Sequence, residues 1–185
     1  MTPSPTIGVV ACSLRNASAN RGLARNAVTQ LGDSARLIDI DSLPLFSEDH
    51  ELPNAEPAQA EGAAWREAVR SVDCLLICTP EYDSYPPAMT LNALNWLSRE
   101  PSPPLKGKPV AVCGAAAGFR GSRRSQAHVR EVLDRMGAQT IEAHFQIQIA
   151  NHFDSSTGDL TSQAAIEEFG RFLNAVKLAV SHHSE

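Results

Sequence analysis

The sequence predicts an α/β fold: a doubly wound, five-stranded parallel sheet with strand order 2-1-3-4-5 and helices on both faces. Two observations predict it. Short apolar runs of strand length recur along the 185-residue chain, and segments with helical spacing of apolar residues lie between them. Strands that alternate with helices favour parallel βαβ units with right-handed crossovers. We expect residues 1–185 to form a single domain.

Apolar runs of strand length occur at five places. The first, third and fourth are nearly continuous, which is typical of parallel strands that helices cover on both faces. The predicted strands are Thr6–Cys12, Arg36–Ile40, Asp73–Thr79, Pro109–Gly114 and Thr140–Ala143.

Five segments between or after these runs place apolar residues on one helical face. Gly137 supplies a stop signal after the fourth segment. The predicted helices are Asn20–Leu31, Pro57–Val72, Ala88–Arg99, Ser122–Met136 and Ser162–Val180.

Composition narrows the class of protein. The chain is 43% hydrophobic and 20% charged, with a formal net charge of −5, so neither nucleic acid nor an acidic membrane surface is an expected partner. No apolar run approaches the roughly 20 residues that span a bilayer, and a cytoplasmic location is the default expectation. The four cysteines lie in or beside apolar runs, where small buried thiols are expected, and their spacing fits no metal site.

The connection after the first strand carries the strongest chemical signal. Ser13, Arg15, Ser18 and Asn20 gather two hydroxyls, a guanidinium and an amide before a helix N-terminus. Unpaired backbone N–H groups and the helix dipole make such a turn a natural phosphate site. An ordinary polar connection with a Ser or Asn helix cap is the alternative.

The connections after the third and fourth strands are also unusual. Thr79–Pro87 contains three prolines, Tyr82 and Tyr85, and a stiff loop of this kind suits the edge of a planar heterocycle as well as simple surface packing. Gly114–Gly121 is rich in small residues, which permit close ligand approach but also suit a flexible helix connection. In a doubly wound sheet, the loops after strands one, three and four should converge near the switch point.

Taken together, these loops resemble a known family. Cys12-Ser-Leu-Arg-Asn-Ala-Ser-Ala-Asn20 is similar to the Gly-Ser-Leu-Arg-x-x-Ser-x-Asn motif of the NAD(P)H-dependent FMN reductases, which include bacterial quinone and chromate reductases. Thr79-Pro-Glu-Tyr-Asp83 is similar to their Thr-Pro-Glu-Tyr-Asn. Further similar segments, in the same order along residues 6–137, are Leu43–Phe46, Asn92–Arg99, Leu105–Val110 and Gly121–Gln126.

The resemblance implies a flavodoxin-like fold with noncovalent FMN and NADPH or NADH as co-substrate. It implies a ping-pong cycle in which a small acceptor such as a quinone or flavin follows the nicotinamide, with no catalytic side chain and no metal. It places the phosphate on Ser13, Arg15, Ser18 and Asn20. The isoalloxazine would be bordered by Pro80, Glu81, Tyr82 and Asp83, and on its other side by Gly114, Ala115, Ala116 and Gly118.

The same resemblance implies a homodimer or homotetramer, and we expect Trp96 and Leu97 of the third helix to contribute to the subunit contact. The chain departs from the family pattern at Cys12, where the family has glycine, and at Asp83, where it has asparagine. Other departures are Pro86, Leu91 and Asn95. Two alternatives remain: a flavodoxin-like electron carrier, and a divergent flavin-binding protein without catalysis.

Overall fold

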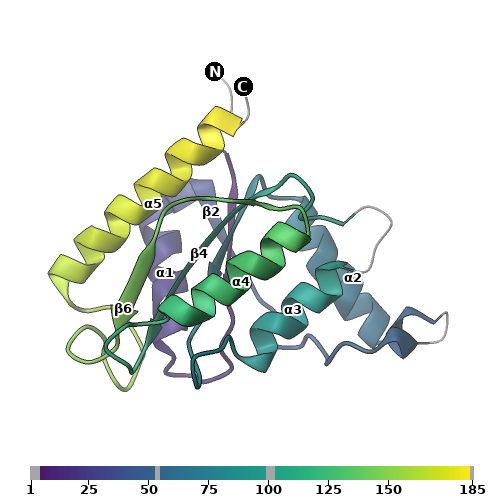
Figure 1. The fold of residues 1–185 in the computed structure, drawn as a ribbon, viewed down its shortest axis with the longest axis horizontal. Coiled ribbons are helices and arrows are strands. Elements are labelled where there is room, and N and C mark those ends of the chain that lie inside the picture. The colour runs from purple at the N-terminus through teal and green to yellow at the C-terminus, as the bar shows by residue number, and fades with distance from the viewer. Residues whose placement is uncertain (1–4, 53–54, 99–102, 184–185) are drawn as a thin grey trace.

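The structure is a computed structural model that describes residues 5–52, 55–98 and 103–183. Its centre is a parallel sheet in the order β2-β1-β3-β4-β5, with β6 also paired to β4 (Figure 1). The predicted α/β fold and strand order are thus confirmed. The strands are β1 (Ile7–Ala11), β2 (Ala35–Ile38), β3 (Cys74–Cys78), β4 (Pro109–Ala116), β5 (Gln139–Thr140) and β6 (Phe145–Gln148).

Five α-helices cover the two faces of the sheet. They are α1 (Ala19–Leu31), α2 (Ala58–Arg70), α3 (Ala88–Ser98), α4 (Arg123–Arg135) and α5 (Gln163–His183), and two short 3₁₀ turns cover Gly32–Ser34 and Glu48–Glu51. Each α-helix overlaps a predicted one, although α2 ends two residues before Val72 and α5 runs three residues beyond Val180. Arg99, the predicted end of the third helix, lies outside the described residues.

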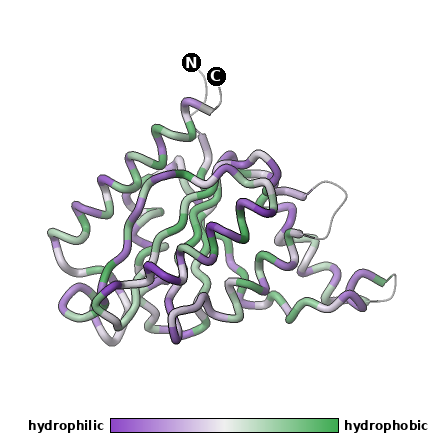
Figure 2. Tube along the Cα trace, in the orientation of Figure 1, coloured by the Kyte–Doolittle hydropathy of each residue, from purple (hydrophilic) through white to green (hydrophobic). Residues whose placement is uncertain are grey.

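The core consists of two apolar layers, one on each face of the sheet. α1 and α5 pack on one face through residues such as Leu23 and Phe169, and α2, α3 and α4 pack on the other through residues such as Val69 and Leu133. Figure 2 shows the corresponding pattern, with apolar central strands and outer helices that alternate between apolar and polar positions. Burial of these two layers holds the carboxyl ends of β1, β3 and β4 at one edge.

The fifth strand differs from the prediction. A single strand over Thr140–Ala143 is wrong: β5 pairs with the start of β4, β6 pairs with its end, and residues 141–144 separate the two. Arg130 of α4 bridges this break, donating to the carbonyl oxygens of Ile141 at 2.8 Å and Ala143 at 2.9 Å. A side chain therefore satisfies backbone acceptors that strand pairing leaves open there.

Trp96 and Leu97 do not form a surface. Both are buried, and the Trp96 indole N–H donates to the carbonyl of Pro44 at 2.8 Å while Phe46 packs edge-on against its ring. Their expected place in a subunit contact is therefore wrong, because the chain's own segment after β2 covers them. Within the described residues, no helix is both long and apolar enough to cross a membrane.

Candidate functional site

The loop between β1 and α1 presents a row of free backbone donors. In the described part of the chain, no backbone N–H of residues 13–17 or of Ala19 donates to another protein group, and Asn16 and Ala17 form a turn before the cap at Ser18. Ser13 is 5% exposed as a residue, and its hydroxyl has no hydrogen-bond partner among the described residues and stays accessible. Free N–H groups beside an accessible hydroxyl at the positive end of a helix form an anion-binding concavity.

The predicted phosphate residues lie around this concavity, but they are not equivalent. Ser18 caps α1, its hydroxyl accepting from the Asn20 N–H at 3.2 Å, and Arg15 is exposed on the loop. The Asn20 side chain also links two loops. Its amide donates to the Ala115 carbonyl and its carbonyl accepts from the Ala115 N–H, and the second N–H of the amide remains for the predicted phosphate contact.

Cys12 does not narrow the turn. Its backbone N–H donates to the Cys78 carbonyl at 2.9 Å, which extends the pairing of β1 with β3, and its side chain packs in the apolar layer under α2, α3 and α4. Burial raises the pKa of the Cys12 thiol to about 12. The thiol therefore stays protonated near pH 7, as is typical of a buried structural cysteine.

The loop after β3 ends in a two-residue hairpin turn. Tyr82 and Tyr85 exchange backbone hydrogen bonds, and the central residues Asp83 and Ser84 have φ angles of 50° and 73°. Such a turn requires positive φ at both central positions, where asparagine and aspartate are tolerated better than most residues. The aspartate at position 83 therefore satisfies a backbone requirement, and its carboxylate lies exposed at the tip of the hairpin.

Glu81 ties this loop to α4. One carboxylate oxygen accepts from the backbone N–H groups of Arg124 at 2.8 Å and Ser125 at 3.1 Å, and so caps the helix from a distant loop. The Arg124 guanidinium donates in turn to the Ser84 hydroxyl at 2.8 Å. The Glu81 side chain is thus committed to the protein, whereas Pro80 is buried at the base of the loop and Tyr82 is 57% exposed at its rim.

The small residues that were predicted to follow the fourth strand divide into two groups. Gly114, Ala115 and Ala116 belong to β4 itself and are buried, and a Cβ at Gly114 would lie 1.9 Å from the Thr79 carbonyl oxygen. The glycine at 114 is therefore explained by the close approach of β3 rather than by a ligand. Gly118 is exposed with open space around it, so the backbone near residues 117–118 remains accessible.

A fourth segment, which the sequence did not single out, supports the site. The connection from β6 to α5 packs on the start of α1: a Cβ at Gly22 would lie 1.8 Å from the Gly158 carbonyl oxygen. Arg25 fastens this connection, donating to Asp159 and to the Thr157 carbonyl. The glycines at positions 22 and 158 are the sequence signal for this close packing, but only the tertiary structure shows that they lie against each other.

The three predicted loops therefore converge, and specific contacts join them. Asn20 links the first to β4, Glu81 links the second to α4, and Thr79 packs on Gly114. The result is an anion cradle at the α1 end, with Tyr82 exposed on the loop after β3 and residues 117–118 exposed on the loop after β4. Such an arrangement suits an elongated ligand with an anionic end and a planar end.

Comparisons with known proteins agree with this arrangement. The family model described as NADPH-dependent FMN reductase matches residues 5–152. The chain is 34% identical to an NAD(P)H-dependent FMN reductase of Pseudomonas aeruginosa, with 91% of each chain covered. It is 31% identical to a quinone reductase of Escherichia coli, covering 90% of this chain and 94% of that one.

Among solved structures, a similar fold occurs in FerB, a flavoenzyme NAD(P)H:acceptor oxidoreductase from Paracoccus denitrificans. The TM-score is 0.79 at 25% sequence identity, with 97% of this chain and 98% of that chain covered.

Proposed function

The chain belongs to the NADPH-dependent FMN reductase family, and from this premise we propose that the loop of residues 13–18 holds the phosphate of FMN. The protein is an FMN-dependent NAD(P)H oxidoreductase. The observation that supports the assignment of the site is the row of free N–H groups at residues 13–17, with the unpartnered Ser13 hydroxyl beside them. Bound there, FMN supplies the hydride-transfer chemistry.

The protein's own groups hold the FMN and orient it. Backbone N–H groups, the Ser13 hydroxyl and the Arg15 guanidinium hold the phosphate. Tyr82, the Pro80–Tyr82 backbone and the residues from Ala116 to Gly118 border the ring. Asn20, Glu81 and Gly114 keep these loops in place from behind. No side chain in this arrangement is assigned as a general acid or base.

We further propose that nicotinamide and acceptor use one open site in turn, in a ping-pong cycle. The side chains of Tyr82 and Tyr85 are 57% and 61% exposed beside that site, which favours a planar acceptor such as a quinone or a free flavin. The four cysteines are free and buried, which is consistent with a cytoplasmic location.

A homodimer or homotetramer is also proposed. With Trp96 and Leu97 buried, its support is the exposed apolar rim of Tyr82, Tyr85 and Leu91. Light scattering at micromolar concentration tests it, and a monomer would contradict it.

The decisive experiment on function is an anaerobic titration. Protein supplied with FMN and freed of excess flavin should be yellow, and NADH or NADPH should bleach its flavin absorbance. Addition of a benzoquinone should restore the colour. A folded preparation that retains no FMN would refute the proposed site, and retention of FMN without bleaching would favour an electron carrier or a non-catalytic flavin protein.

A further inference from the structure

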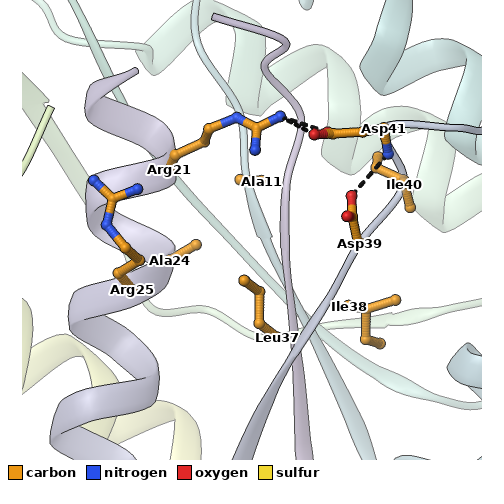
Figure 3. Close-up of a pocket in the computed structure, with 9 residues that line it drawn as sticks. All are labelled: Ala11, Arg21, Ala24, Arg25, Leu37, Ile38, Asp39, Ile40 and Asp41. Atoms are coloured by element: carbon orange, nitrogen blue, oxygen red, sulfur yellow. Dashed lines mark hydrogen bonds and ion pairs between the residues drawn. The ribbon is translucent and has the colours of Figure 1, made fainter. Parts of the chain in front are cut away.

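A second concavity lies beside the phosphate loop, between α1 and the carboxyl end of β2 (Figure 3). Ala11, Ala24 and Leu37 contribute an apolar floor, whereas Arg21, Asp39 and Asp41 contribute a polar rim. It lies on the β2 side of β1, and the loops after β3 and β4 lie on the opposite side, because the strand order is β2-β1-β3-β4.

One side chain joins this pocket to the phosphate loop. The Arg21 Nε donates to the Ser13 carbonyl at 2.8 Å. Its Nη2 contacts both carboxylate oxygens of Asp41 at 2.5 Å (Figure 3). The pocket and the proposed phosphate site therefore share a wall. A ligand that extends past the phosphate loop, away from β3 and β4, enters the pocket next.

The charge of the rim is unbalanced. Arg21 is neutralised by Asp41, and Arg25, also at the pocket, is neutralised by Asp159. Asp39 has no cationic partner among the described residues; one of its oxygens accepts from the Asp41 N–H at 2.9 Å, and the other is open. Asp39 is therefore the charged residue of this lining that has no ion pair within the described ranges, and its exposed carboxylate offers a free hydrogen-bond acceptor beside apolar side chains.

This combination of apolar side chains and a free carboxylate favours an adenosine without a phosphate on its ribose over one that carries it. A purine ring fits an apolar floor, and a carboxylate accepts hydrogen bonds from the hydroxyls of a ribose. A phosphate on that ribose would instead meet the charge of Asp39, and the juxtaposition of like charges is strongly unfavourable. A dinucleotide exceeds its nicotinamide mononucleotide half by an adenosine monophosphate, and this remote end reaches the pocket if it passes the phosphate loop on the side of β2.

We propose that this pocket receives the adenosine of the nicotinamide co-substrate and that Asp39 accepts hydrogen bonds from its unphosphorylated ribose, so that NADH is preferred over NADPH. The inference rests on the proposed function, because it assigns the remote end of the same co-substrate. The family is named for NADPH, and this chain is expected to depart from that preference.

The test combines kinetics and binding. With the FMN-loaded protein and benzoquinone as acceptor, kcat/KM is measured for NADH, NADPH and reduced nicotinamide mononucleotide, which lacks the adenosine. We expect kcat/KM to be at least about tenfold higher for NADH than for NADPH, from the loss of one hydrogen bond to a charged group. Asp39→Asn should reduce that ratio to near one, and should lower the ratio of NADH to the mononucleotide about tenfold.

A matched control is Asp33→Asn, which removes an exposed carboxylate at the opposite end of α1 and should leave both ratios unchanged. Calorimetry with ADP-ribose and its 2′-phosphorylated form adds a readout that needs no turnover. We expect binding of ADP-ribose alone, weakened by Asp39→Asn.

The outcomes separate the two proposals. Equal use of NADH and NADPH, with ratios unaffected by Asp39→Asn, overturns the pocket assignment while the oxidoreductase function stands. Absence of bleaching by all three reductants overturns the proposed function. In that case binding of ADP-ribose that depends on Asp39 would still support the pocket, and its absence would remove it.

Discussion

Asn20 and Ala115 exchange two hydrogen bonds of 2.9 Å, one in each direction, across 95 residues of sequence. The Asn20 side-chain amide thereby pairs with β4 as the next peptide group of a strand would, two residues beyond the point where β3 ends opposite Cys113. The start of α1, which carries the proposed phosphate cradle, is fixed to the sheet by this pair.

Asn20→Ala should destabilise the protein by about 2–3 kcal/mol, because it leaves a buried N–H and a buried carbonyl of Ala115 without partners. Chemical denaturation of the FMN-free protein measures this effect. Asn20→Asp keeps the acceptor for the Ala115 N–H but places a negative charge near the cradle, so it should weaken FMN binding more than it weakens folding. Equal stability of all three proteins would show that the pair contributes nothing.

Arg15→Ala should weaken FMN binding by about 1.5–3 kcal/mol if the guanidinium contacts the phosphate. The side chain is exposed and has no ion pair within the described residues, so the unfolding free energy should stay the same. Quenching of FMN fluorescence on binding measures the affinity. Arg171→Ala, an exposed arginine on α5, is the matched control, and an Arg15→Ala affinity equal to that of the control would refute the contact.

Removal of the carboxylate of Glu81 should free the N-terminus of α4. Glu81→Ala loses two charge-assisted hydrogen bonds to helix N–H groups, for an expected loss of about 1–2 kcal/mol of stability. Glu81→Gln retains an acceptor oxygen and should lose less. Thermal and urea unfolding measure the series, with Glu131→Ala on the exposed face of α4 as the control. A Glu81→Ala variant as stable as the control would contradict the capping role.

The hairpin turn at Asp83 predicts opposite effects for two substitutions. Asp83→Gly should stabilise the protein by about 0.5–1 kcal/mol, because glycine adopts positive φ without steric cost. Asp83→Val should destabilise it by about 1–2 kcal/mol, because a β-branched side chain clashes with the backbone there. Both are measured by urea unfolding. A glycine variant that is less stable than the valine variant, as expected at an exposed helix position, would refute the turn assignment.

Alkaline pH should destabilise the protein through its buried thiols. The folded state keeps the Cys12 proton up to a pKa of about 12, whereas the unfolded thiol loses it near pH 8.5. The unfolded state then binds fewer protons, so stability falls as pH rises from about 8.5 towards 12. Each such thiol contributes a slope of about 1.4 kcal/mol per pH unit. Cys12→Ala should reduce the slope by one thiol's share in urea titrations between pH 9 and 10.5, and an unchanged slope would contradict it.

The central strands and the five helices followed from patterns that are local in the sequence, because buried parallel strands are continuous apolar runs and helices repeat every 3.6 residues. The sheet order followed from the alternation of strands with helices. The break in the fifth strand did not follow from a local pattern. The backbone carbonyls left without strand partners there accept hydrogen bonds from Arg130, which belongs to a different element. The alternation of Phe145, Ile147 and Ile149 with glutamines is a strand signal in hindsight, typical of an edge with one buried face.

The positions of the site loops were predicted, but the roles of single polar residues within them were not. Asn20 and Glu81 carry groups that can bind a ligand or the protein equally well. Which partner they take depends on Ala115 and on the start of α4, which are remote in sequence. Spacing alone cannot show whether the missing Cβ at Gly114 serves a ligand or, as here, the carbonyl of Thr79.

The two ends of Arg21 have a thermodynamic consequence. Its Nε holds the Ser13 carbonyl in the cradle, and its Nη2 holds Asp41 at the rim of the neighbouring pocket. If a bound molecule shifts Asp41, the Arg21 guanidinium would carry that shift to the Ser13 carbonyl, and by reciprocity occupancy of the cradle would change the affinity of the pocket by the same factor. The affinity for the dinucleotide would then depend on the fraction of protein that holds FMN, and the affinity for FMN would depend on bound dinucleotide.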